Sequence, residues 1–205
     1  MFKPELSHGC HIKGRESTRR AAYAATMRLF LNYARRVALF VGLALIATPA
    51  LADKLTFDHR MVPALKAVLD SGDAAMVDFN ASNPKNVVDL IAIRGRSAKD
   101  WTEALVIIAR TPQGKVRSAA DWAGELQREA QAKCASIFTE LARDENSATY
   151  ERRSTGCPSG YPPIALYRMV GNKRSLFLLA VLVKDSLDET ERGQWLAMMS
   201  SAHIE

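Results

Sequence analysis

The segment Met27–Ala52 divides this chain into a leader and a folding body, because it has the parts of an export signal in order. A basic stretch precedes the apolar run Val37–Ala47, which is shorter than the roughly 20 residues that a membrane-spanning helix needs. The small residues Ala50 and Ala52 then precede Asp53, a pattern typical of signal-peptidase sites. We therefore predict a signal peptide over residues 27–52 with cleavage after Ala52. The alternative is an uncleaved N-terminal anchor.

Residues 1–26 do not fit this signal, since they are polar and mixed in charge. We interpret them as a mis-annotated or disordered extension, with translation starting at Met27. An unusually long basic region before the apolar run is the alternative.

The excess positive charge belongs to the leader. The chain has 28 basic and 22 acidic residues, of which residues 1–52 hold 8 and 2, so the remaining 20 and 20 balance. A body without net positive charge has no excess cation to release counterions from phosphates. We therefore expect no nucleic-acid partner.

Two cysteines remain after the leader, Cys134 and Cys157. Export places them in an oxidising compartment, where a pair is usually bonded. Their spacing is not that of a redox CxxC motif. We predict a structural disulfide that stabilises the fold by roughly 3 kcal/mol, with two separate buried thiols as the alternative.

Two helices have recognisable starts. Ser118, with Asp121 three residues later, predicts a capped helix, and its apolar residues recur at intervals of four: Trp122, Leu126, Ala130 and Cys134. Ser186 with Glu189 predicts a second helix over Leu187–Ser201. For the segment Met61–Leu69, periodicity does not distinguish helix from strand.

Four runs rich in β-branched and large apolar residues predict strands. They are Val87–Ile93, Ala104–Ala109, Ile164–Val170 and Leu176–Val183. Turn residues between the first two and between the last two predict antiparallel hairpins, and Ala148–Ser154 predicts a more exposed strand. The expected class is α+β, with an antiparallel sheet covered by helices in an α/β/α-type sandwich. Residues 53–205 would form this single domain.

The body lacks the residues that several common catalytic sites require. Its two histidines, His59 and His203, lie near its two ends, so neither a three-ligand zinc site nor a Ser-His-Asp triad is expected. Glycine-rich phosphate motifs are absent from the sequence. We predict no catalytic residues, no metal and no cofactor.

Charged and aromatic residues gather at predicted strand ends. Arg94 and Arg96 follow one strand, Trp101 and Glu103 begin its neighbour, and Tyr161 lies in a proline-rich loop. A hairpin would bring the arginines near the indole and the carboxylate. We predict a ligand-binding surface here; the alternative is a solvated hairpin tip.

The segments WTEALVII, AKC, GCPSGYPPIALYRM and QWLAMMSSAHI resemble those of uncharacterised exported proteobacterial proteins, over roughly residues 87–204. The pattern is also similar to the PsbP-like type of α/β/α sandwich, whose members are accessory or binding proteins. The resemblance implies a fold and a compartment rather than a reaction. The segment before Val87 has no counterpart in that group.

These observations lead us to expect a soluble periplasmic or secreted protein that acts as a non-catalytic binding or accessory module. Its partner would be an unknown protein or small molecule in the cell envelope, without a stable membrane span after cleavage. The alternative is an exported hydrolase in which carboxylates such as Glu103 with Asp100 perform acid/base catalysis.

Overall fold

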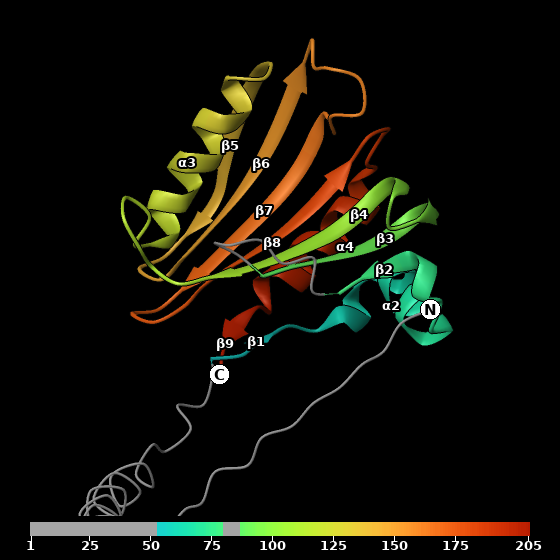
Figure 1. The fold of residues 1–205 in the computed structure, drawn as a ribbon, viewed down its shortest axis with the longest axis horizontal. Coiled ribbons are helices and arrows are strands. Elements are labelled where there is room, and N and C mark those ends of the chain that lie inside the picture. Colours follow the sequence, from blue (N-terminus) through green and yellow to red (C-terminus); the bar gives the residue numbers. More distant parts are fainter. Residues whose placement is uncertain (1–52, 80–86) are drawn as a thin grey trace, which may run out of the picture. The chain divides into compact units, whose positions relative to one another are not determined.

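An antiparallel sheet forms the centre of the fold (Figure 1). The computed structural model describes residues 53–79 and 87–205, and in them the strand order is β2-β3-β4-β8-β7-β6-β5. The bounds of these strands are β2 Val77–Asp78, β3 Val87–Ser97, β4 Asp100–Arg110, β5 Ala135–Arg143, β6 Ser147–Thr155, β7 Ile164–Gly171 and β8 Leu176–Val183. Together with the helices described below, the sheet confirms the predicted α+β class.

Both predicted hairpins are present. β3 pairs antiparallel with β4, and β7 pairs antiparallel with β8. β4 also pairs with β8, where Val106 lies opposite Ala180. This central pairing joins the first hairpin to the strands that follow much later in the chain.

The central strand β8 is buried on both of its faces. Leu178 and Ala180 belong to one apolar cluster, whereas Leu179 and Val181 belong to another. Because successive side chains of a strand point to opposite faces, the two clusters lie on opposite faces of the sheet. Burial on both faces explains why the sequence LFLLAVLV is a continuous apolar run.

Helix α3 (Ala119–Gln131) packs on one face of the sheet. Its Trp122 is buried in the same cluster as Tyr167 of β7. The helix begins as predicted, since the Ser118 hydroxyl accepts a hydrogen bond from the Asp121 N–H at 3.1 Å.

Helices α2 (Pro63–Ser71) and α4 (Glu189–Ser200) belong to the cluster on the other face. The predicted start of α4 at Leu187 is wrong by two residues. Asp188 is the N-cap and accepts a hydrogen bond from the Glu191 N–H at 2.8 Å. An aspartate nearer the helix thus takes the role expected of Ser186.

The undecided segment Met61–Leu69 is helical over most of its length. Pro63 occupies the first helical position of α2, and Gly72 ends the helix with a φ of 63°. Proline suits the first position because a backbone N–H there would have no acceptor within the helix, so its absence costs no hydrogen bond. Two short 3-10 helices, His59–Met61 and Ala74–Met76, flank α2.

Two strands at the sheet's other end differ from expectation. β5 was not predicted, because its polar residues mask the pattern and Ile137 is 72% exposed. β6 was predicted to be more exposed, but most of its side chains are buried, including those of Thr149 and Glu151. Polar side chains that are paired inside the fold do not mark a strand as exposed.

The two ends of the described body meet in a small ribbon. β1 (Leu55–Thr56) pairs antiparallel with β9 (His203–Ile204). Asp53 extends this anchorage, since its carboxylate accepts a hydrogen bond from Asn172 at 2.9 Å and pairs with Arg174. These two contacts fix this residue to the β7–β8 turn.

The predicted extension over residues 1–26 and the predicted signal peptide over residues 27–52 lie outside the described residues, as do Ala50 and Ala52. The body, described by itself, forms one compact unit. Within residues 53–79 and 87–205, no helix is both long and apolar enough to span a bilayer.

Candidate functional site

Glu103, one of the predicted site residues, is a buried structural carboxylate. It is 3% exposed and accepts a hydrogen bond from the Trp195 indole N–H at 2.7 Å. Arg94 lies across the hairpin with its Nε 3.4 Å from the carboxylate, and it also pairs with Glu191 of α4. The structure therefore brings Arg94 and Glu103 together as predicted, in contacts that attach α4 to the sheet.

Trp101 and Arg96 lie near the tip of the same hairpin. The Lys184 ammonium is 3.9 Å from the centroid of the Trp101 ring, a cation–π distance. Arg96 is 90% exposed, with its Nε 3.6 Å from the carboxylate of Asp100. These contacts agree with the alternative of a solvated hairpin tip.

Tyr161 belongs to a different group of residues. Its hydroxyl accepts a hydrogen bond from Arg152, and its ring lies 4.5 Å from that guanidinium. Arg152 also contacts Tyr167, which belongs to the α3 cluster. Lys133, two residues after the end of α3, approaches the Tyr161 ring as well. Glu103 contacts α4 on the opposite face, and the contacts of Tyr161 with Arg152 and Lys133 do not join it to the other four predicted residues.

The predicted disulfide is present. Cys134, just after α3, is bonded to Cys157 in the β6–β7 loop, with their Cα atoms 4.8 Å apart. The bond ties the end of α3 to the loop that carries Tyr161.

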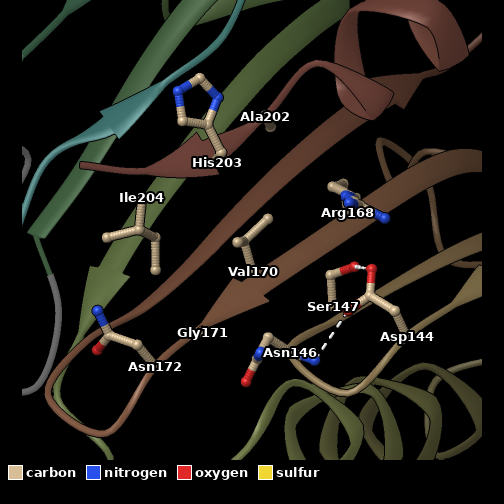
Figure 2. Close-up of a pocket in the computed structure, with 10 residues that line it drawn as sticks. All are labelled: Asp144, Asn146, Ser147, Arg168, Val170, Gly171, Asn172, Ala202, His203 and Ile204. Atoms are coloured by element: carbon tan, nitrogen blue, oxygen red, sulfur yellow. Dashed lines mark hydrogen bonds between the residues drawn. The ribbon is translucent and has the colours of Figure 1, made fainter.

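A pocket lies beside β9, on the face of the sheet that carries α4, and has a volume of about 380 Å³. Figure 2 shows Val170 and Arg168 of β7 between the C-terminal segment and the β5–β6 turn. We call this cavity the β9 pocket. It is lined by Asp144, Asn146, Ser147, Arg168, Val170, Gly171, Asn172, Ala202, His203 and Ile204.

Arg168 is the cation of the β9 pocket, and its charge is poorly compensated. One terminal nitrogen donates a hydrogen bond to the Thr149 hydroxyl at 3.0 Å. Its Nε is buried without a hydrogen-bond partner, and no carboxylate of the described residues lies in ion-pair contact with it. Burial lowers the pKa of Arg168 from its usual value, although the more distant Asp144 carboxylate acts in the opposite direction.

Asp144 uses its carboxylate within the β5–β6 turn. It accepts hydrogen bonds from the Ser147 hydroxyl and from the Asn146 N–H, the latter at 2.8 Å. The bond from Ser147 is the main reason that the pKa of Asp144 lies below its usual value. Asp144 therefore stays ionised and holds the turn in place, rather than forming a salt bridge with the Arg168 guanidinium.

A second pocket, of about 460 Å³, is lined by residues of the segment from Thr56 to Arg60 together with Ser201 and His203. The Thr56 hydroxyl is buried there without a hydrogen-bond partner. His203 lines both cavities. Neither cavity includes a residue of the predicted hairpin site.

The sequence carries a signal for Arg168. Arg168 interrupts the apolar run IALYRMV of β7, and a charged residue inside an otherwise buried strand requires an explanation. The lining residues from the β5–β6 turn and the C-terminal segment had no such signal, because they converge only through the fold.

The described residues hold no cluster of three or more histidine, cysteine or acidic side chains arranged to bind a metal ion. In comparisons with known proteins, no family model matches the chain, and no match was found among curated proteins.

Proposed function

We propose that this chain is a periplasmic, non-catalytic binding or accessory module whose ligand occupies the β9 pocket. The observation that carries the proposal is Arg168, a half-buried guanidinium with one hydrogen bond that faces a cavity of about 380 Å³. Cavities of this volume suit small molecules. A partly buried charge without an ion-pair partner in the protein is stabilised when the ligand supplies that partner.

The contacts of Glu103 favour this proposal over a carboxylate hydrolase. One Glu103 oxygen accepts the Trp195 indole N–H and the other faces Arg94. Asp100, the second acid of that alternative, is 67% exposed and faces Arg96. The Glu103 carboxylate is thus buried between two protein partners, whereas a catalytic acid needs access to a substrate.

Compartment and architecture are parts of the same proposal. The Cys134–Cys157 disulfide supports export to an oxidising compartment through the segment 27–52. The two apolar clusters on opposite sheet faces support an α/β/α-type sandwich, as the resemblance to the PsbP-like type implies. We propose that this resemblance reflects a shared accessory or binding role.

Retention of a ligand from periplasmic small-molecule extract tests the binding role. The mature chain is incubated with the extract and desalted, and native mass spectrometry compares wild type with Asn146→Trp, which replaces a lining residue of the pocket by a bulky indole. Gln127→Trp, an equivalent change at an exposed site on α3, is the control.

We expect wild type and Gln127→Trp to retain a small molecule unchanged in mass from the extract, and Asn146→Trp to lose it. Equal retention by all three proteins would remove the β9 pocket from the proposal. Recovery of a hydrolysed product would favour the hydrolase.

A further inference from the structure

We propose that the ligand of the β9 pocket is a small monocarboxylate with a short apolar body, whose carboxylate is bound by the guanidinium of Arg168. This inference rests on the proposed function and specifies the chemical class of the ligand. It follows from three properties of the pocket: the unused donors of Arg168, the charge balance of the lining, and the apolar side chains opposite.

The donors of Arg168 exceed its acceptors in the protein. A guanidinium has five N–H donors, and the hydrogen bond to Thr149 uses one of them. A carboxylate accepts hydrogen bonds from a guanidinium at shorter distance and with greater strength than a neutral acceptor does. The Asn146 side chain, which also lines the pocket, offers a further amide donor.

The charges of the lining disfavour a doubly charged ligand. Arg168 contributes one positive charge, and Asp144 contributes one negative charge that the Ser147 hydroxyl and the Asn146 N–H keep in place. A doubly charged phosphate would meet stronger repulsion from Asp144 than a carboxylate would. One guanidinium therefore matches a monoanion better than a dianion.

The rest of the cavity wall is suited to hydrocarbon. Val170, Ala202 and Ile204 line the pocket alongside the polar residues, and Figure 2 shows Val170 and Ile204 between His203 and the β7–β8 turn. Apolar side chains around a few polar groups are typical of sites that bind small amphipathic molecules. The ligand would place its carboxylate at Arg168 and its apolar body toward Val170.

Hexanoate is a suitable probe, with hexanamide as a neutral molecule of the same shape and with inorganic phosphate, at a pH above its second pKa, as a dianion. Amide chemical shifts of the mature protein are followed during each titration. The variants are Arg168→Gln and Arg168→Lys, with Arg96→Gln as a control that removes the same charge from an exposed site. Thermal melts establish that each variant is folded.

We expect wild type and Arg96→Gln to bind hexanoate at least about tenfold more tightly than hexanamide or phosphate, since a hydrogen bond to a charged group contributes that much or more. Shifts should centre on residues 144–147, 168–172 and 202–204. Arg168→Gln should abolish the preference, and Arg168→Lys should keep only part of it.

Equal affinity of wild type for hexanoate and hexanamide, tighter binding of phosphate, or shifts outside the pocket would overturn the ligand class. If a ligand from the extract is still retained by wild type and lost by Asn146→Trp, the binding function stands and the carboxylate assignment alone fails. If Arg168→Gln does not fold, the comparison of Arg168→Lys with wild type decides.

Discussion

Glu103 illustrates how one buried side chain can hold several elements together. Its carboxylate receives the indole N–H of Trp195 from α4 and faces Arg94 from the neighbouring strand. A buried carboxylate is tolerated because both partners compensate its desolvation. The residue therefore supports the fold at the place where the sequence predicted a ligand.

Replacing Glu103 by leucine should destabilise the protein. Without its acceptor, the buried Trp195 N–H is left unsatisfied, and the free energy of unfolding should fall by about 1–3 kcal/mol. Urea denaturation measures this change. Arg96→Leu, at an exposed position, should change stability by less than about 0.5 kcal/mol, and an equal loss in the two variants would contradict the structural role of Glu103.

Asp53 should make stability depend on pH. The hydrogen bond from Asn172 is the largest cause that lowers its pKa, followed by that from Ser175 and aided by Arg174. A lowered pKa stabilises the fold above the unfolded pKa near 4, and this contribution is lost as the pH falls through the folded value.

Asp53→Asn should therefore lower the melting temperature near neutral pH, and the difference from wild type should shrink toward about pH 2, where both side chains are uncharged. Thermal melts across this range test the expectation. Asp100→Asn, at an exposed carboxylate, is the control. A difference for Asp53→Asn that stays constant with pH would show that its charge contributes nothing.

At the scale of elements, the β3–β4 hairpin depends on a glycine. Gly95 has a φ of 139°, and a Cβ added to it would lie 2.4 Å from the Asp100 carbonyl oxygen. Backbone atoms cannot move away as a flexible side chain could. The close approach occurs beside Trp101, opposite Gly95 in the register.

Gly95→Ala should therefore cost more stability than Gly114→Ala. Gly114 has a φ of 58° with open space around it. Its substitution should therefore lower the free energy of unfolding only by the cost of holding alanine in the left-handed conformation, about 1–2 kcal/mol. Chemical denaturation of both variants measures the difference. Equal losses would mean that the hairpin relaxes around the added methyl group.

The disulfide joins α3 to the β6–β7 loop and should stabilise the body. Replacing Cys134 and Cys157 together by serine should lower the free energy of unfolding by roughly 3 kcal/mol, because the unfolded chain regains the freedom of the closed loop. Denaturation of the oxidised protein and of the double variant provides the comparison. An unchanged stability would argue against a structural role for the bond.

Elements with a simple periodic pattern were predictable, and those with buried polar residues were not. The apolar runs of β7 and β8 and the Ser118 cap led to correct expectations because local chemistry determines them. β6 appeared exposed because Thr149 and Glu151 are polar, but both are buried. Glu151 pairs with Arg153 and with Arg192 of α4, a tertiary compensation that no local pattern reveals.

In the candidate site, too, some contacts were predictable from local sequence and others depended on the tertiary fold. The pairing of Arg94 with Glu103 was predictable from a hairpin register, whereas the position of Tyr161 depended on which sheet face its loop covers. The β9 pocket combines Asp144, Arg168 and Ile204, which lie on three separate segments. They converge because of the strand order and the C-terminal ribbon, and no local sequence motif predicts either of these.

At the scale of the whole molecule, the leader and the body should separate. We predict that the mature protein begins at Asp53, whose side chain is held by the β7–β8 turn immediately after the predicted cleavage position. Intact mass of the exported protein tests this. A mature chain that retains Val37–Ala47 would contradict cleavage and indicate an anchored protein.

Amide chemical-shift mapping of the mature protein with periplasmic small-molecule extract tests the central claim most directly, because it needs no prior choice of ligand. The account predicts shifts at residues 144–147, 168–172 and 202–204 and little change in the hairpin at residues 94–103. Shifts confined to the hairpin, or no shifts at all, would contradict a binding role for the β9 pocket.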